Sequence, residues 1–274
     1  MSVDEHTIEL AGSPAFYRTA PAPGAPTLYV HGVPTSSDDW LPFLERSGGI
    51  APDLIGFGRS GKGGNLDYSI TGLTDFLERL LAHLGIDRVK LAVHDWGAAV
   101  GLVFAQRHPE RVERIALING VPLFHADGVR WPLLARLWTR PGIGELAMGA
   151  TTRRVLARTL RSGSSDPLAA WPDSRVASIW QQFDQGTQRA ILRLYRSADE
   201  NELASAGAGI DRLKAPTLVL WGEADPWLPA TVGDTYAEVL PHATIDRVQR
   251  AGHWPWWDRP EVLDRLASFM AATT

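Results

Sequence analysis

A short apolar strand that runs through an aspartate-bearing turn into a helix of small residues constrains this chain more than any other feature. The run KLAVHDWGAAV covers residues 90–100, with the turn at 94–97. This strand–turn–helix order is typical of a nucleophile elbow, in which the reactive side chain stands exposed above a sheet. Because Asp95 holds the reactive position, we expect a carboxylate nucleophile, which displaces at carbon and leaves an ester on the enzyme.

An aspartate before a helix is often only a cap that accepts backbone hydrogen bonds. Two further residues favour the catalytic interpretation of Asp95. Asp225 follows a predicted strand at 217–221, and His253 follows another predicted strand at 244–248. The carboxyl ends of strands are where open α/β sheets place their sites. The order nucleophile, acid, histidine is also the one that this kind of fold uses, so we predict a triad.

Strand and helix patterns alternate along most of the chain. Strands are expected at 7–10, 16–19, 27–30, 49–51, 89–93, 114–118, 217–221 and 244–248, and helices at 38–46, 73–84 and 260–270, the last with Pro260 at its first position. Such alternation predicts an α/β class protein with a mostly parallel, eight-stranded sheet flanked by helices.

The alternation breaks once, between residues 118 and 217. Helical patterns fill this stretch at 131–139, 145–160, 176–183 and 187–196. A single crossover of that length is uncommon in a compact domain. We therefore expect a helical cap domain at 121–211, inserted over the carboxyl edge of a core formed by 1–120 and 212–274. The alternative is that these helices pack on the flanks as ordinary crossovers.

Composition is that of a globular enzyme. The 274 residues allow a sizeable core, and 27 basic against 31 acidic residues leave no basic surface for nucleic acid. The absence of cysteine excludes disulfides and a thiol nucleophile. The N-terminus lacks the apolar segment of a signal peptide, and no apolar run approaches the ~20 residues that span a bilayer. We expect a cytoplasmic monomer or homodimer without metal, cofactor, membrane or nucleic-acid partner.

One glycine-rich segment imitates a nucleotide-binding loop. Residues 56–61 fit GxGxxG and residues 56–62 fit GxxxxGK. A phosphate loop needs Ser or Thr after the lysine and a helix that begins there. Gly63 stands at that position and the loop continues, which argues against nucleotide binding.

Several segments together resemble the α/β-hydrolases of the epoxide hydrolase and haloalkane dehalogenase branch. The matching segments are HGVP at 31–34, DLIGFGRS at 53–60, VHDWG at 93–97, WGEAD at 221–225 and AGH at 251–253. The resemblance implies that Asp95 is the nucleophile, that His253 activates water against the ester and that Asp225 orients the histidine. It also implies an oxyanion hole formed by the backbone N–H groups of Val33 and Trp96.

The resemblance leaves the first chemical step open. A haloalkane dehalogenase needs two N–H donors for the departing halide, and Trp96 is one. Val33 stands where some members carry an asparagine, so the second donor must come from the cap. The cap tryptophans available for this are Trp131, Trp138, Trp171 and Trp180. Alanines stand at 98 and 99, where fluoroacetate dehalogenases need arginine, so a carboxylate-bearing halide is disfavoured.

An epoxide hydrolase instead needs an acid for the ring oxygen. That family uses two cap tyrosines, the second commonly followed by arginine, and Tyr195-Arg196 matches this second motif. Tyr195 is the only tyrosine of the expected cap, so Trp138 or His125 must replace the first tyrosine, or one donor suffices. We expect an epoxide hydrolase that acts on a small apolar substrate and water. A haloalkane dehalogenase is the alternative, followed by a catalytically silent ligand-binding relative.

Overall fold

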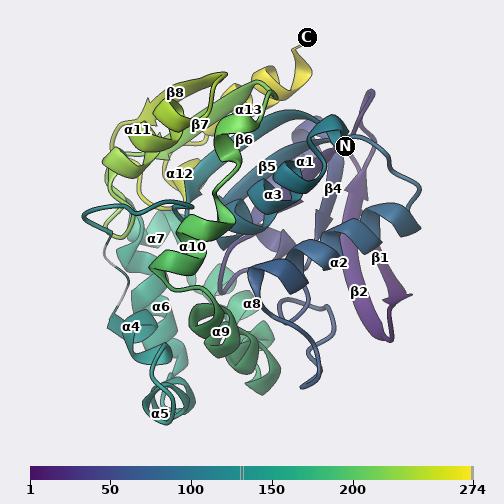
Figure 1. The fold of residues 1–274 in the computed structure, drawn as a ribbon. Coiled ribbons are helices and arrows are strands. Elements are labelled where there is room, and N and C mark those ends of the chain that lie inside the picture. The colour runs from purple at the N-terminus through teal and green to yellow at the C-terminus, as the bar shows by residue number, and fades with distance from the viewer. Residues whose placement is uncertain (130, 132, 273–274) are drawn as a thin grey trace.

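A sheet of eight strands runs through the centre of the molecule (Figure 1), in a computed structural model that describes residues 1–129, 131 and 133–272. The strands are β1 (Asp4–Leu10), β2 (Ser13–Ala20), β3 (Thr27–Val30), β4 (Gly49–Pro52), β5 (Val89–Asp95), β6 (Val112–Gly120), β7 (Thr217–Gly222) and β8 (Ala243–Val248). Their order in the sheet is β1-β2-β4-β3-β5-β6-β7-β8. Only the β1–β2 and β2–β4 pairs are antiparallel, which confirms the expected mostly parallel sheet.

The central strands are buried on both faces. Every residue of β3 and β7 is buried, whereas β8 at the edge exposes half of its residues. Strands covered on both faces read as continuous apolar runs, which is why these segments were recognisable in the sequence. Since the five strands β3, β5, β6, β7 and β8 run parallel, the loops that follow them meet at one edge of the sheet.

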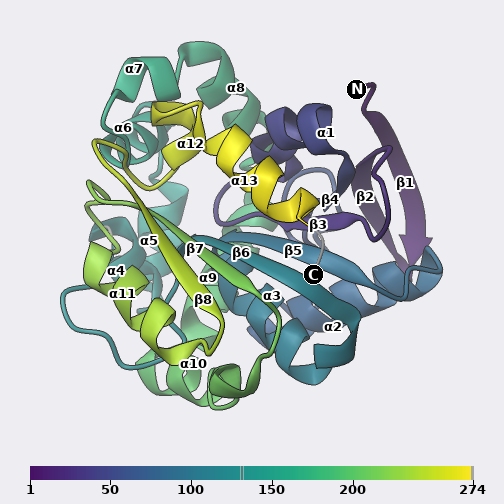
Figure 2. The ribbon, with the colours of Figure 1, turned by 90° about the horizontal axis from the view of Figure 1, so that it is seen from above.

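Helices cover both faces of the sheet. The core helices are α1 (Leu41–Ser47), α2 (Ile70–His83), α3 (Trp96–Arg107), α11 (Ala230–Val239), α12 (Pro255–Asp258) and α13 (Val262–Ala271). Figure 2 shows α1 and α13 side by side on one face and α2 and α3 on the other. The expected start of the last helix at Pro260 is wrong. Residues 259–263 form a tight turn, with Val262 N–H donating to Arg259 and Leu263 N–H to Pro260, and α13 begins only at Val262.

The chain between β6 and β7, residues 121–216, forms a helical insertion. Its helices are α4 (Leu133–Trp138), α5 (Ile143–Gly149), α6 (Arg153–Ser162), α7 (Pro167–Ala170), α8 (Asp173–Gln182), α9 (Gln185–Ser197) and α10 (Glu200–Ala206). Figure 1 shows α4 to α9 gathered beyond one end of the sheet. Pro132, within the helix expected at 131–139, lies outside the described residues.

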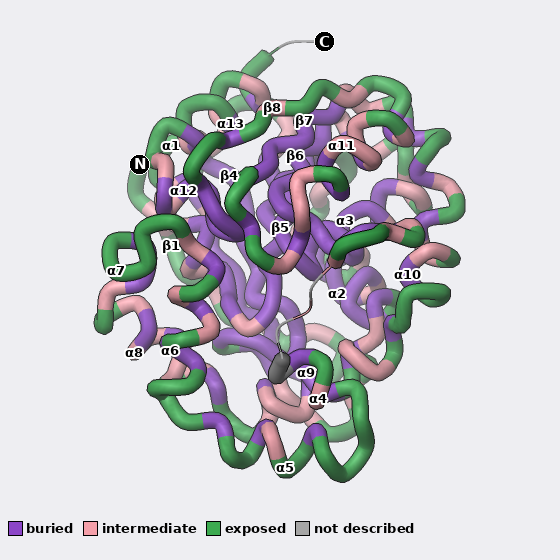
Figure 3. The backbone as a smooth tube through the Cα atoms, turned by 90° about the vertical axis from the view of Figure 1, so that its left-hand side faces the viewer, coloured by how far each residue is buried: buried purple, intermediate pink, exposed green. Residues whose placement is uncertain are grey.

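The helix expected at 145–160 is two helices. The Thr152 side chain accepts a hydrogen bond from the Val155 N–H and so caps a new helix, α6, after α5 has ended at Gly149. The buried residues of the insertion and of the sheet form one continuous apolar cluster. Figure 3 shows buried segments, in purple, in both parts of the chain. Apolar packing therefore holds the insertion against the sheet. Across the described ranges, no helix combines the length and apolar character that a membrane crossing requires.

Candidate active site

Asp95 occupies a strained turn between β5 and α3. Its backbone has φ 51° and ψ −124°, a conformation that residues with a Cβ rarely adopt. The helix after it packs tightly: a Cβ on Gly97 would come within 2.2 Å of the Val30 carbonyl oxygen. Glycine at 97 thus lets α3 approach β3 closely enough for Asp95 to stand at the carboxyl end of the sheet.

The carboxylate of Asp95 lies between one backbone donor and one imidazole. Its Oδ2 accepts a hydrogen bond of 2.8 Å from the Val33 N–H, and its Oδ1 lies 3.6 Å from His253 Nε2. Gly32 makes this approach possible, because a Cβ there would come within 2.4 Å of the Asp95 side chain. Of the two expected oxyanion donors, Val33 reaches the carboxylate. The Trp96 N–H makes no hydrogen bond to it within the described part of the chain.

Asp225 and His253 are paired as the sequence predicts. Asp225 Oδ2 lies 2.7 Å from His253 Nδ1, and its Oδ1 accepts from the N–H groups of Trp227 and Leu228. Asn119, at the end of β6, donates from Nδ2 to Asp225 Oδ2 at 2.8 Å. The role of Asn119 as a donor was missed in the sequence, although its place at a strand end is the signal that identified the triad candidates. Glu223, the neighbouring carboxylate, is exposed.

The two carboxylates control the charge of the histidine. Burial alone lowers the pKa of His253, but Asp225, and then Asp95, outweigh it and raise that pKa to about 10. The imidazole is therefore positively charged at neutral pH. The charge of Asp95 therefore contributes to the raised pKa of His253, and its loss would lower that pKa.

The backbone of His253 is held by His94 and by the Gly163 carbonyl. His94 Nε2 donates to the His253 carbonyl at 2.8 Å, and the His253 N–H donates to the Gly163 carbonyl of the insertion at 2.6 Å. Burial, and then the charge on His253, lower the pKa of His94 well below its ordinary value, so the His94 imidazole is neutral.

A cavity of about 50 Å³ separates Asp95 from the insertion. Its lining is mostly apolar and consists of Val33, Pro34, Asp95, Trp131, Trp138, Thr151, Leu156, Thr159, Leu160, Phe183, Tyr195, Trp227, Leu228, His253 and Trp254. Three of the residues expected at the site, Val33, Trp138 and Tyr195, therefore share this cavity with Asp95 and His253. The side chain of Trp96 lies behind Tyr195, with ring centroids 4.9 Å apart.

Tyr195 and Trp138 of the insertion bring a phenol and an indole N–H to the cavity, which Thr151 and Thr159 also line. Burial, and then the charge of Asp95, raise the pKa of Tyr195 far above its ordinary value, which keeps the phenol protonated. The Nε1 atoms of Trp96 and Trp138 are buried and have no hydrogen-bond partner among the described residues. The Trp171 N–H already donates to Ser164 Oγ at 3.1 Å, which argues against Trp171 as a halide donor.

His125 is not at the cavity, so the suggestion that it replaces a first tyrosine is wrong. Its side chain is exposed and pairs at 3.2 Å with Glu200, the first residue of α10, on the surface. No group of three or more potential metal ligands occurs in the ranges that the structure describes.

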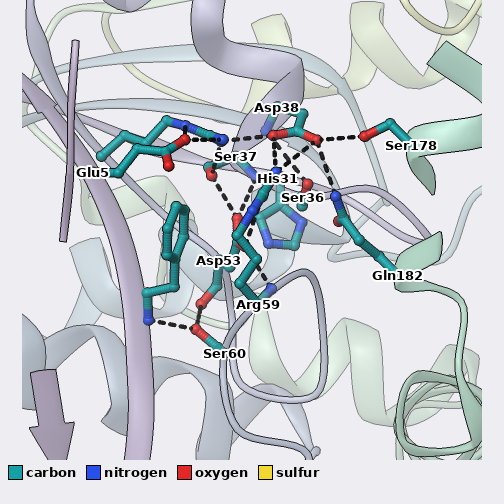
Figure 4. A network of polar contacts seen from close by, with 12 residues as sticks. Glu5, His31, Ser36, Ser37, Asp38, Asp53, Arg59, Ser60, Ser178 and Gln182 are labelled. Carbon is teal, nitrogen blue, oxygen red and sulfur yellow. Dashed lines mark hydrogen bonds and ion pairs between the residues drawn. The ribbon is translucent and has the colours of Figure 1, made fainter. Parts of the chain in front are cut away.

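A buried network around Asp53 joins the loop after β3 to the glycine-rich segment after β4 (Figure 4). Asp53 Oδ1 accepts from the backbone N–H of Ser37 at 2.8 Å and from its hydroxyl, and Oδ2 accepts from the Arg59 N–H at 2.7 Å. A Cβ on Gly58 would come within 2.1 Å of Asp53 Oδ2. The glycine-rich segment therefore packs against the Asp53 carboxylate, which takes up the Arg59 N–H. The next helix, α2, begins only at Ile70. This excludes the phosphate-loop geometry.

Comparison with known proteins agrees with this arrangement. The sequence profile of the alpha/beta hydrolase fold family matches residues 26–260. The chain belongs to the alpha/beta hydrolase fold family. It is 31% identical to a haloalkane dehalogenase of Mycolicibacterium paratuberculosis, over 92% of this chain and 85% of that protein. It is 24% identical to epoxide hydrolase 1 of Caenorhabditis elegans, over 86% of this chain and 62% of that protein.

Among solved structures, the epoxide hydrolase CorEH without ligand superposes with a TM-score of 0.82 at 24% identity, covering 98% of this chain and 99% of that one. The α/β-hydrolase resemblance and fold expected from the sequence are thus confirmed. The protein is a hydrolase of this family with both epoxide hydrolase and haloalkane dehalogenase relatives.

Proposed function

We propose that this hydrolase converts small epoxides to vicinal diols through an ester on Asp95. One observation carries the proposal: Tyr195, a phenol that burial keeps protonated, lines the same cavity as Asp95. The rings packed around the phenol within the described ranges belong to Trp96, Trp131 and Trp138. Their indole N–H groups can only donate, so the phenol proton is left for a ligand. An epoxide oxygen is a poor leaving group unless such a donor stabilises its developing charge.

In the first step, Asp95 Oδ1 attacks a ring carbon and the carbon–oxygen bond of the ring breaks. The released oxygen takes the Tyr195 proton, and the proton that His253 carries in the resting enzyme restores the phenol. Oδ2 keeps its hydrogen bond to the Val33 N–H and becomes the ester carbonyl. The products of this step are a neutral ester and a neutral imidazole.

In the second step, His253 Nε2 takes a proton from water and the hydroxide adds to the ester carbonyl carbon. Negative charge develops on Oδ2, where the Val33 N–H already donates. When the intermediate collapses, the Cγ–Oδ1 bond breaks and the acid proton passes to the departing alkoxide. The diol leaves, Asp95 is again a carboxylate and His253 is again protonated. Asp225 holds the imidazole in the orientation that the proton transfer from water needs.

The size of the cavity points to short substrates. A water molecule needs roughly 10–15 Å³ of such space, so 50 Å³ holds about three to five waters. A three- or four-carbon epoxide occupies a comparable volume. We also propose that residues 121–211 act as a cap domain on a core of 1–120 and 212–274, because the insertion supplies much of the apolar lining.

Haloalkane hydrolysis is the second candidate, and a different observation favours it. The indole N–H of Trp138 is buried without a partner among the described residues and lines the cavity, and the Trp96 ring packs against Tyr195 with ring centroids 4.9 Å apart. Two N–H donors are what a departing halide requires, and the displacement needs no proton. A catalytically silent protein is disfavoured, because Asp95, His253 and Asp225 are all in place.

Propylene oxide and 1-bromopropane distinguish the two activities, because they match in chain length. We expect diol from the first and little bromide from the second. Tyr195→Phe should slow ester formation from the epoxide by roughly 10²–10⁴-fold, the usual contribution of a general acid. Trp138→Phe serves as the matched variant, since it removes the N–H donor and keeps an aromatic ring, although a smaller one. If Tyr195→Phe leaves epoxide opening intact while Trp138→Phe abolishes bromide release, the protein is a dehalogenase.

A further inference from the structure

The loop that carries His253 is held by the same part of the insertion that lines the cavity. The His253 N–H donates to the carbonyl of Gly163, the residue that follows α6. One side of α6 lines the cavity. Gly252 lies so close to this segment that a Cβ on it would come within 2.1 Å of the Gly163 oxygen. The position of α6 is therefore coupled directly to the backbone of His253.

Asp258 hydrogen-bonds both the loop that carries His253 and the segment that follows α6. It belongs to the core helix α12 and is only 7% exposed. Its Oδ2 accepts from the Gly252 N–H at 2.7 Å and from the Ser165 N–H at 2.9 Å, and its Oδ1 accepts from the Asp166 N–H at 3.0 Å. One of these donors lies beside His253 and two belong to the insertion. A single buried carboxylate thus ties the histidine loop to residues 163–166.

We propose that Asp258 is a positioning residue for His253. It locks residues 163–166 onto the histidine loop and thereby sets the distance between the imidazole and the Asp95 ester. The inference rests on the proposed function, in which His253 activates water against that ester. In the free enzyme Nε2 lies 3.6 Å from Asp95 Oδ1, so a small shift of the loop changes the space in which the water must react. A misplacement of about 1 Å costs roughly 10²-fold in rate.

A second carboxylate provides the matched control. Asp184 also ties the insertion to the core, since it caps α9 through the Thr187 N–H at 2.9 Å and pairs with Lys62 of the core at 2.9 Å. Within the described part of the chain, these contacts do not involve residues 251–254. Asp184→Asn therefore weakens a contact between the insertion and the core and leaves the hydrogen bonds of the histidine loop in place.

Asp258→Asn is the test, because an amide must point its NH₂ group at one or more of the three backbone donors. We expect ester formation on Asp95, followed by intact-protein mass spectrometry with propylene oxide, to change less than threefold. Ester hydrolysis should slow roughly 10²-fold, so that the adduct accumulates. The proton between His253 Nδ1 and Asp225 Oδ2 should give a downfield proton resonance in the wild-type protein, and this resonance should shift or broaden in Asp258→Asn. Asp184→Asn should alter neither readout.

The proposal is overturned if Asp258→Asn slows both steps equally, if the imidazole resonance is unchanged, or if Asp184→Asn gives the same pattern. The resonance needs no substrate. A wild-type protein that forms no ester would therefore refute the proposed function while the resonance still tests Asp258. Should Asp258→Asn fail to fold, Gly163→Ala replaces it: its Cβ would come within 2.7 Å of Trp227 and 2.8 Å of Trp254 and push the segment away from His253. The same selective loss of hydrolysis is expected.

Discussion

Replacement of Asp225 by asparagine removes one charge and keeps the shape of the side chain. Asp225 receives hydrogen bonds from Asn119, Trp227 and Leu228 and pairs with His253, so all of its partners are donors. An asparagine has only one acceptor oxygen. Its NH₂ group must therefore face either the pair Trp227 and Leu228 or the pair Asn119 and His253.

Both arrangements leave buried donors unpaired. A lost partner of this kind costs roughly 1–3 kcal/mol, so Asp225→Asn should lower the free energy of unfolding by about that amount. The catalytic effect should be larger. Without the Asp225 carboxylate, the pKa of His253 should fall, because that charge is the largest of the causes that raise it. The imidazole also loses the carboxylate acceptor that holds its tautomer. By analogy with an aspartate-to-asparagine change in a serine protease triad, we expect ester hydrolysis to slow by about 10⁴-fold.

Rapid mixing with propylene oxide, followed by acid quench and intact-protein mass spectrometry, separates the two steps. The Asp225→Asn protein should form the ester at nearly the wild-type rate and then retain it. Glu223→Gln is the control, since Glu223 is exposed on the same loop, and it should behave as the wild type. A retained hydrolysis rate in Asp225→Asn, or its loss in Glu223→Gln, would refute the assignment of the acid.

Three further predictions follow from the same geometry. Because the pKa of His253 is raised from 6.5 to about 10, its pairing contributes stability that is complete below pH 6.5 and is lost as the pH rises toward 10. Urea unfolding at pH 6 and pH 10 should therefore show a smaller decline for Asp225→Asn than for the wild type. Phe183→Ala should admit longer epoxides, measured as a higher kcat/KM for 1,2-epoxyhexane relative to propylene oxide, at a cost of about 3–5 kcal/mol in stability. Gly32→Ala should abolish ester formation, measured by mass spectrometry, because its Cβ would overlap the Asp95 side chain, while circular dichroism reports whether the fold is kept.

The sequence by itself determined the class of fold and the identity of the triad candidates. Continuous apolar runs such as 217–221 report burial on both faces, and burial of that kind is a local property that a short segment reveals. Asp95 and Asp225 were recognisable because each stands at or just past the end of such a run, and His253 because it follows the last strand, the half-exposed β8. The Asp225–His253 pair at 2.7 Å follows from parallel strands that end at one edge.

Tertiary structure alone decided which groups share the cavity. Tyr195 and His125 are both polar residues of the expected cap, yet Tyr195 lines the cavity and His125 lies on the surface. The contacts of Asp258 with Ser165 and Asp166 join residues more than 90 positions apart. Such contacts depend on how the insertion packs against the sheet, which is a long-range arrangement that local periodicity does not encode.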